Sequence, residues 1–263
     1  MDTCLTFFMG AAVIGATTAL VLFGLIRLFG LNRTSFYRRT LAAERAGTTF
    51  KEIHAGAFIL VDDKGKPRAT LLMTQEGPSL VMLDENGTPR AGLSAFKGGP
   101  DLGASLILAD ENGTPRAMLA ALKVGPGLVL SDDKGKDRAL MSLTKEGPIV
   151  YVADGNGNGG GATLNATKDG PKLALYEENG KERAALEASK DVAGLHLFDE
   201  NGKDRAMLFV TKDTVGLNLR DENRKLRAAM GSGVIRADGT MEISPESSLR
   251  LFNSDAHLVW RAP

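Results

Sequence analysis

The chain has 263 residues, of which 43% are hydrophobic and 6% aromatic, and it contains 31 glycines. This length allows one or two domains with a buried core, while many glycines and few aromatics favour frequent turns and a thin, repetitive core. Lys+Arg and Asp+Glu both number 32, and no long run of like charges occurs after the first fifty residues. A surface with such balanced charge has no electrostatic attraction for nucleic acid, which excludes a protein that binds nucleic acid through its charge. The single cysteine, Cys4, excludes an internal disulfide framework and a cysteine-based zinc site.

Residues 5–26 carry no charge and are predicted to form a transmembrane helix. As a helix this stretch is about 33 Å long, enough to cross the hydrocarbon core. The acidic start MDTC and the long apolar stretch favour an uncleaved anchor over a signal peptide. Nearby arginines follow the helix and none precedes it, so the positive-inside rule favours a cytoplasmic main domain, with a periplasmic or extracellular one as the alternative. Ala11, Gly15 and Ala19 share one helical face and are candidates for packing between membrane helices.

Four segments follow from these patterns. Residues 1–31 form the transmembrane helix, residues 32–56 a basic juxtamembrane helix and linker, residues 57–231 a β-repeat domain, and residues 232–263 a C-terminal capping segment. The arginines of the second segment suit anionic headgroups, so membrane lipid is an expected partner.

A unit of about 22 residues recurs after residue 56. Each copy ends an apolar run with an acidic residue, at Asp62, Asp84, Asp110, Asp132, Asp154, Glu177, Asp199, Asp221 and Asp255. An arginine followed by alanine comes six residues later in all but the fifth copy, at Arg68, Arg90, Arg116, Arg138, Arg183, Arg205, Arg227 and Arg261. A fixed period of this length indicates a stacked repeat architecture. The acid and the arginine are expected to frame each repeat, by capping the turn and by pairing on the strand surface.

Apolar residues alternate on both sides of each acidic turn, which predicts strands. The Asn-Gly between them predicts a two-residue hairpin turn. In that register Met82 faces Ala91, Leu80 faces Leu93 and Asp84 faces Pro89, which places every recurrent apolar position on one face.

The opposite face varies between copies, with Val81 and Arg90 in one and His196 and Phe209 in another. We expect this variable face either to be exposed to solvent or to carry differences between copies that serve a function. Gly-Pro pairs such as those in KEGP and KDGP predict a second tight turn that joins one unit to the next.

The predicted fold class is therefore all-β, with tandem hairpin repeats that form an elongated sheet or a β-solenoid-like rod behind the membrane helix. A parallel solenoid would stack like charges about 4.8 Å apart, which is unfavourable. Antiparallel hairpins let acids and arginines interleave and are preferred. A single sheet would need a partner for its leucine face, and self-association, for instance as a trimer, is the simplest way to supply one.

The stretches AFILVDDKGKPRATL, GLVLSDDKGKDRALM and GLHLFDENGKDRAML resemble a loosely defined group of bacterial proteins with tandem L-x-L-x-D-x-x-G-x-x-R-A-x-L repeats, often behind an N-terminal membrane helix or coiled coil. The resemblance covers residues 57–228. It implies an architecture and no particular chemistry.

Few residues suggest chemistry. DGNGNG matches the start of a calcium loop, with Asp154, Asn156 and Asn158 as weak metal candidates, but Asn165 stands where the bidentate acid is expected. His54, His196 and His257 occupy non-equivalent places in the repeat and form no ligand set by spacing. No phosphate loop or nucleophile elbow is present in the sequence, so no cofactor and no enzymatic activity are expected.

These patterns indicate a membrane-anchored scaffold or assembly subunit that forms a homo-oligomer or joins a larger membrane complex. One alternative is a binding module whose variable face, with Tyr176, His196, Phe198 and Phe209 exposed together, recognises a partner protein or a polysaccharide. A further alternative is an enzyme with a site between the capping segment and the last repeats.

Overall fold

The computed structural model describes residues 52–96, 103–123, 125–153, 155, 159–236 and 239–262. The chain divides into two compact units, residues 1–136 and 137–263. Within the described ranges the structure consists of strands and turns, which confirms the all-β prediction.

The strands are short and similar in length. The first unit contains β1 (Ala57–Val61), β2 (Pro67–Met73), β3 (Pro78–Leu83), β4 (Pro89–Phe96), β5 (Gly103–Ala109), β6 (Pro115–Leu122) and β7 (Gly125–Ser131). The second unit contains β8 (Asp137–Leu143), β9 (Pro148–Ala153), β10 (Gly161–Thr167), β11 (Gly170–Tyr176), β12 (Glu182–Ala188), β13 (Val192–Phe198), β14 (Asp204–Thr211), β15 (Val215–Arg220), β16 (Leu226–Ile235), β17 (Met241–Phe252) and β18 (Leu258–Ala262).

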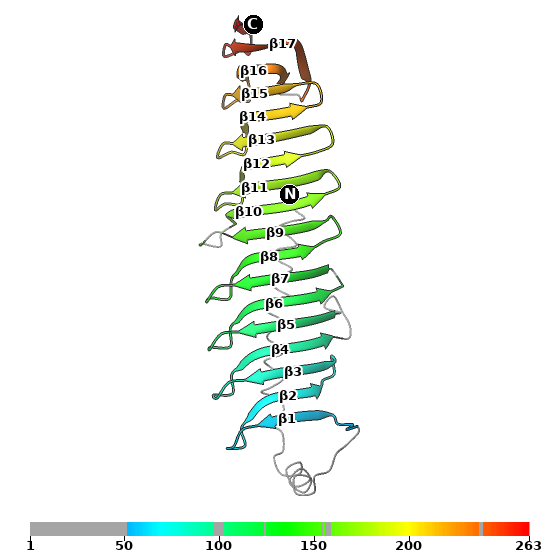
Figure 1. Ribbon diagram of the computed structural model, residues 1–263. Helices are drawn as coiled ribbons and strands as arrows, with labels where there is room; N and C mark the ends of the chain where they lie inside the picture. The colour runs from blue at the N-terminus through cyan, green and yellow to red at the C-terminus, as the bar shows by residue number, and fades with distance from the viewer. Residues whose placement is uncertain are drawn as a thin grey trace. The chain divides into compact units, whose positions relative to one another are not determined.

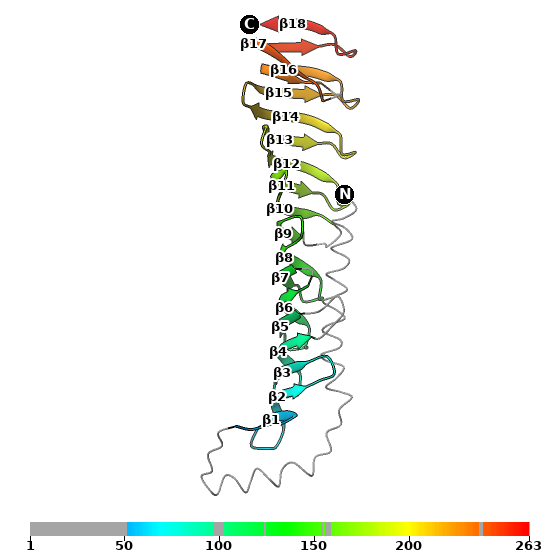
Figure 2. The same cartoon turned by 90° about the vertical axis from the view of Figure 1, so that its right-hand side faces the viewer.

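Within each unit, every strand pairs antiparallel with the next strand in the chain (Figures 1 and 2). The hairpin arrangement is thus confirmed, and the parallel solenoid is wrong. In an antiparallel meander, equivalent positions of successive copies lie two strands apart, about 9.6 Å, so acids of neighbouring repeats do not stack directly on one another.

The acidic turn has a three-residue loop, and the prediction of a two-residue turn is wrong. In the second repeat the N–H of Asp84 donates to the carbonyl of Thr88 at 2.9 Å, and the N–H of Gly87 donates to the carbonyl of Asp84 at 3.1 Å. Gly87 has φ of 83°, the left-handed conformation that this kind of loop requires and that glycine adopts without strain. Asp84 therefore closes the turn with Thr88 and does not face Pro89.

A β-bulge at the repeat arginine restores the predicted register of the apolar residues. Leu83 pairs with Pro89, but Met82 pairs with Ala91 and Leu80 with Leu93, so Arg90 is the extra residue. The same shift recurs at Arg68, Arg116, Arg183, Arg205 and Arg227. The extra residue in the loop and the extra residue in the bulge offset each other in the pairing register. The apolar residues were therefore assigned to the correct shared face, although the turn was assigned incorrectly.

The turn that links one unit to the next begins with a hydroxyl residue. At Thr74 the hydroxyl oxygen accepts the N–H of Glu76 at 3.2 Å and that of Gly77 at 3.1 Å. Thr144, Thr167, Ser189 and Thr211 begin equivalent turns. Gly77 then opens the next strand with φ of 144°, and a Cβ there would lie 2.0 Å from the carbonyl oxygen of Ala95. The predicted Gly-Pro turn is therefore a Thr-x-x-Gly turn, which Gly-Pro completes.

The two faces differ in burial, in a sense that the sequence did not reveal. The recurrent leucine positions are exposed, with Met82 and Leu93 each 50% accessible, whereas Val81 on the opposite face is 3% accessible. Ile107, Met207 and Phe209 are also buried on that second face. These positions of the variable face are thus less accessible than the leucine positions in both units, so the first of the two expectations for this face, that it is solvated, does not hold for them.

The C-terminal segment contains two more turns of the same hydrogen-bonding type. In the last one Asn253, and not Asp255, holds the turn, because its side-chain oxygen accepts the N–H groups of Asp255 and His257. Val259 accordingly takes the bulge position of the repeat arginine, which the sequence pattern places at Arg261, and Trp260 takes the position of the repeat alanine. The sequence pattern therefore misplaced the last copy by two residues, because the carboxamide of Asn253 caps the turn in the same way as the carboxylate does in other copies.

The predicted membrane helix, the juxtamembrane segment and the packing candidates Ala11, Gly15 and Ala19 lie outside the described residues. Among the residues that are described, no helix is long and apolar enough to cross a membrane.

Candidate interaction surface

Each described repeat turn that begins with Asp is held by one carboxylate oxygen that accepts two backbone N–H groups. Asp84 Oδ1 accepts the N–H groups of Asn86 and Thr88, both at 2.9 Å, and Asp199 Oδ1 accepts those of Asn201 and Lys203 at 2.9 and 3.0 Å. Asp62, Asp110, Asp132 and Asp221 bond in the same way. In the turn of Glu177 the side-chain oxygen of Asn179 accepts the N–H of Lys181 at 2.9 Å instead. The carboxylates of Asp84, Asp110, Asp132 and Asp199 therefore cap their turns in this structure.

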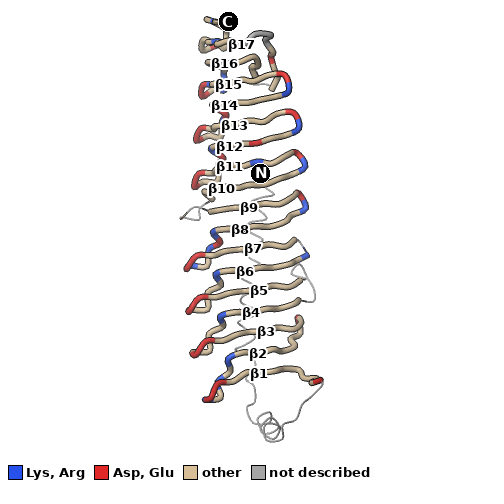
Figure 3. The backbone as a smooth tube through the Cα atoms, in the orientation of Figure 1, with Lys and Arg blue, Asp and Glu red and all other residues tan. Residues whose placement is uncertain are grey.

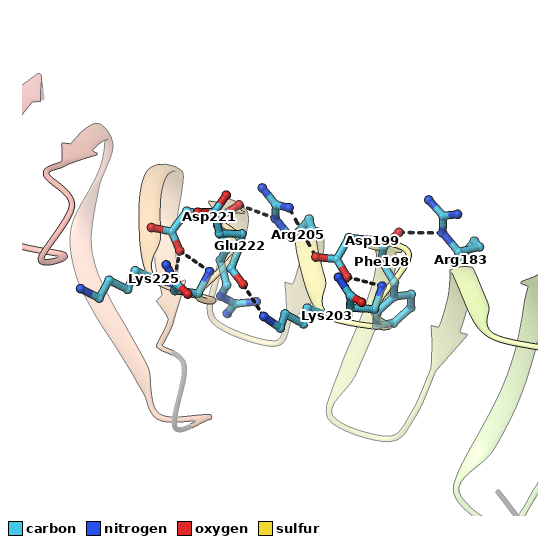
Figure 4. A network of polar contacts seen from close by, with 11 residues as sticks. Arg183, Phe198, Asp199, Lys203, Arg205, Asp221, Glu222 and Lys225 are labelled. Carbon is cyan, nitrogen blue, oxygen red and sulfur yellow. Dashed lines mark hydrogen bonds and ion pairs between the residues drawn. The ribbon is translucent and has the colours of Figure 1, made fainter.

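The repeat arginine joins its own turn to the next repeat. The Nε of Arg205 donates to the carbonyl of Arg220 at 2.9 Å, while its guanidinium reaches Asp199 Oδ2 at 3.4 Å (Figure 4). Arg116 bonds the carbonyl of Ser131 at 2.9 Å and Asp110 at 3.3 Å. Because one rigid guanidinium makes both contacts, each repeat is coupled to its neighbour along one end of the strands.

Arg90 makes the same two contacts, to the carbonyl of Ala109 at 3.2 Å and to Asp84 at 3.7 Å. Turn lysines add to this coupling, since Lys203 Nζ donates to the carbonyl of Glu222 at 2.7 Å (Figure 4). Arg138 lies in β8, at the start of the second unit, while Asp132 lies in the first. Three of the four predicted framing pairs are therefore brought together within a unit.

Hydrogen bonds keep the framing acids ionised. The backbone N–H of Lys66 lowers the pKa of Asp62, and that of Thr88 lowers the pKa of Asp84. At Asp110 desolvation raises the pKa, but the N–H groups of Thr114 and Asn112 together with Arg116 outweigh it and the net pKa is lowered. Arg183 lowers the pKa of Glu177, and the N–H of Lys203 lowers that of Asp199. These carboxylates serve as charged structural acceptors and not as proton donors near neutral pH.

Charged residues are concentrated at the turns of each unit, and the strands between them are mostly uncharged (Figure 3). On the exposed side this leaves a continuous apolar surface, which we call the leucine face. It consists of two rows of cross-strand neighbours, a middle row and an alternating row.

The middle row of the second unit is Met141, Val150, Leu164, Leu173, Leu186, Leu195, Leu208, Leu217, Met230, Leu249 and Ala262. The alternating row is Ala139, Val152, Ala162, Leu175, Ala184, Leu197, Ala206, Leu219, Ala228, Leu251 and Trp260. No member of either row is charged or polar. In the alternating row a small alanine separates larger side chains, so the surface has shallow pits every second strand.

The first unit repeats both rows. Its middle row is Phe58, Leu71, Leu80, Leu93, Leu106, Leu119 and Leu128, and its alternating row is Leu60, Ala69, Met82, Ala91, Leu108, Ala117 and Leu130. The alanine that follows each repeat arginine is thus the residue that forms the pit.

Exposure on the leucine face is high for residues of this type. Leu186 is 55% accessible, Leu164 51%, Leu119 54% and Met141 57%. Isolated exposed leucines are ordinary on protein surfaces, but a contiguous apolar area larger than a few hundred Å² usually marks an interface. The leucine face is therefore the candidate functional surface of both units.

The opposite face of the second unit is built around Phe209, which is 0% accessible. It pairs with Gly194 on one neighbouring strand and with Gly216 on the other. A Cβ at Gly216 would lie 2.5 Å from Phe209 Cζ and 2.4 Å from the carbonyl oxygen of Gly233. The Phe209 ring therefore occupies space that is open only because Gly194 and Gly216 have no side chains.

The aromatic group predicted for a binding face is not exposed as a set. His196 stacks on Phe198 with ring centroids 6.0 Å apart and planes 9° apart, and its Nε2 lies 3.3 Å from Glu187 Oε1. Phe209 is fully buried, and Tyr176 is partly buried. The recognition surface that we expected from these four residues is therefore not formed as a unit.

The weak calcium candidates Asp154, Asn156 and Asn158 lie outside the described residues. Within the described ranges, no group of three or more His, Cys, Asp or Glu is arranged to hold a metal ion. His54 lies near Glu52 at 2.8 Å, with both side chains largely exposed.

Sequence reasoning missed the linking-turn hydroxyls, although a signal was present. Thr74, Thr144, Ser189 and Thr211 each follow the acid of their repeat by twelve residues. It also missed a charge-reversed turn, in which Arg236 takes the acid position and forms an ion pair with Glu242 six residues later.

The comparisons with known proteins add no family: no protein-family model matches this chain, and no curated protein matches it.

Proposed function

We propose that this protein is a non-catalytic, membrane-anchored assembly subunit, whose β-repeats present the leucine face to other protein chains. The observation that carries the proposal is the leucine face itself. Its middle row runs across all the strands of each unit without a polar residue, yet many of its side chains are about half exposed, as at Leu186 and Leu93. Repeat proteins use such extended surfaces for binding.

The distribution of polar groups supports a structural role. The conspicuous acids and arginines are engaged in turn caps and inter-repeat bonds, as at Asp199 and Arg205. Lowered pKa values suit permanent acceptors and not general acids or bases near neutral pH.

The membrane attachment in the proposal rests on the sequence. Residues 5–26 are long and apolar enough to cross a bilayer, and the basic residues that follow favour a cytoplasmic repeat domain. The same anchored arrangement is what the resemblance to L-x-L-x-D-x-x-G-x-x-R-A-x-L proteins implies.

Membrane fractionation of the full-length chain, followed by mild detergent extraction and mass measurement, tests the proposal. We expect the chain to stay in the membrane pellet after a carbonate wash and to elute in a discrete protein assembly heavier than its own 27.9 kDa. A chain that is released by carbonate, or that is extracted as a monomer without any partner, would contradict it. Protease accessibility in intact spheroplasts then fixes the side of the membrane.

A further inference from the structure

We propose that the leucine face is covered by the leucine face of a second copy of this chain. The inference rests on the proposed function and names the partner of that surface. Its premise is that each unit is a one-layer meander whose exposed side is apolar over its whole width, as the middle row from Met141 to Met230 shows.

The area of the leucine face is sufficient for a stable homo-oligomer. Eleven strands in the second unit have ten spacings of about 4.8 Å, and the two rows, at about 7 Å of strand for each same-face residue, cover about 14 Å, which gives about 700 Å² of flat area. The seven strands of the first unit add about 400 Å² on the same basis. The area of the second unit alone is close to the roughly 800 Å² per partner of a standard interface, and it exceeds the largest apolar patch of an ordinary monomer.

The relief of the surface favours a second copy over an unrelated protein. Small and large residues alternate in one row with a period of two strands, as at Ala184, Leu197, Ala206 and Leu219. A partner must have ridges with the same period of about 9.6 Å if it is to fill the alanine pits along many strands. Another leucine face has that period by construction, and isologous contacts of this kind are the commonest in soluble oligomers.

The chemistry of the surface argues against a lipid bilayer as the occupant. Surfaces that lie in the membrane interface combine basic residues with Trp, Tyr or Phe, which sit at headgroup depth. In the two rows only Phe58 and Trp260 are aromatic, and no basic residue interrupts them. Lipid chains also gain nothing from periodic pits, whereas interdigitating side chains do.

Site-specific cross-linking of the full-length chain in native membranes tests the occupant directly. The single native cysteine allows a Cys4→Ser background, into which Leu186→Cys, Leu195→Cys or Leu208→Cys is introduced. A short bis-maleimide should join two copies through the middle-row position that lies near the two-fold axis of the isologous interface. Asn201→Cys, exposed in a turn of the same repeats, is the matched control and should remain uncross-linked.

A charge-insertion variant gives the second readout. Leu186→Glu with Leu208→Glu leaves half-exposed positions half exposed in an isolated copy, so the β-sheet circular dichroism should persist, but it places charges inside the proposed interface. We expect the detergent-extracted assembly to fall to the mass of one chain. Lys190→Glu, in an exposed linking turn, makes the same net charge change and should keep the assembly intact.

The outcomes separate this inference from the proposed function. Cross-linked copies and a charge-sensitive homo-oligomer support both. A single copy in fixed ratio with a different protein keeps the proposed function and overturns the inference. Homo-oligomers that survive the double charge and do not cross-link through the middle row also overturn it, since another part of the chain then holds them. A lone monomer that is labelled on this face by a lipid-phase photoreagent overturns both.

Discussion

The two faces of the sheet make opposite predictions for neighbouring residues of β14. Phe209 is 0% accessible and Leu208, one residue earlier, is 48% accessible. Truncation of either to alanine removes a large apolar side chain from the same strand. The pair therefore compares the two faces with the backbone position held nearly constant.

The expected costs differ about fourfold. Phe→Ala in a core typically costs about 3–5 kcal/mol, and we expect about 4 kcal/mol here, because Gly194 and Gly216 flank the ring and have no side chains that could relax into the hole. Leu→Ala costs about 2–5 kcal/mol when fully buried. For a half-exposed leucine in an isolated copy we expect about 1 kcal/mol.

Urea denaturation in mild detergent measures both variants. Far-UV circular dichroism reports on all strands, and fluorescence of Trp260, the only tryptophan, reports on the end of the second unit. With a slope of about 2 kcal/mol per molar urea, the midpoint should fall by about 2 M for Phe209→Ala and by about 0.5 M for Leu208→Ala. If the leucine face is buried between copies, the second shift should grow with protein concentration.

One result would refute the reasoning. Equal losses for the two variants, independent of protein concentration, would mean that Leu208 lies in the interior of a single copy. The assignment of the leucine face as an outer surface would then be wrong.

Three further predictions concern the backbone and the turns. Gly216→Ala should abolish stable folding of the second unit, since the added Cβ meets the carbonyl oxygen of Gly233 at 2.4 Å; Gly56→Ala, with nothing within 4 Å, should leave the melting temperature unchanged. Arg224 occupies the turn position of the repeat glycine with φ of 64°, so Arg224→Gly should stabilise the chain by about 1 kcal/mol in urea titrations, and a loss would show that its side chain contributes more than its backbone costs. Folding lowers the pKa values of five framing acids, Asp62, Asp84, Asp110, Glu177 and Asp199, so their contribution to the free energy of unfolding is present above the unfolded pKa of about 4 and is lost as pH falls through the folded pKa values. The urea midpoint should therefore be flat from pH 6 to 9 and fall below about pH 4. A midpoint that rises in acid would contradict this.

The sequence was sufficient for the strands, their antiparallel order and the shared face of the leucines. These features follow from local rules, since alternation predicts strands and Asn-Gly predicts a hairpin. The turn itself was misassigned because two deviations cancel. A three-residue loop and a bulge at Arg90 give the same pairing of Met82 with Ala91 as a simple two-residue turn, and the apolar pattern responds only to the pairing.

The burial of the two faces could not be read from the pattern. Periodicity shows that the leucines share a face, but it does not show which face a single copy leaves open. Phe209 illustrates the difficulty, because its burial depends on glycines on two other strands and on Gly233 beyond them. The candidate surface was therefore located by its residues in the sequence, but its exposure was established only by the structure.

The regularity of the chain is itself informative once the exposure is known. In the second unit the buried face changes from one strand to the next, with Ala185, His196, Met207 and Asn218 as successive neighbours. The exposed middle row keeps Leu, Met or Val at nearly every strand. A buried residue needs to suit only its own local neighbours, so repeats are free to differ there as long as volume is conserved. A constant exposed row has no such local requirement in an isolated copy. Its constancy is explained if every repeat meets the same partner surface at the same spacing, and another copy of the leucine face meets that condition along the full length of each unit.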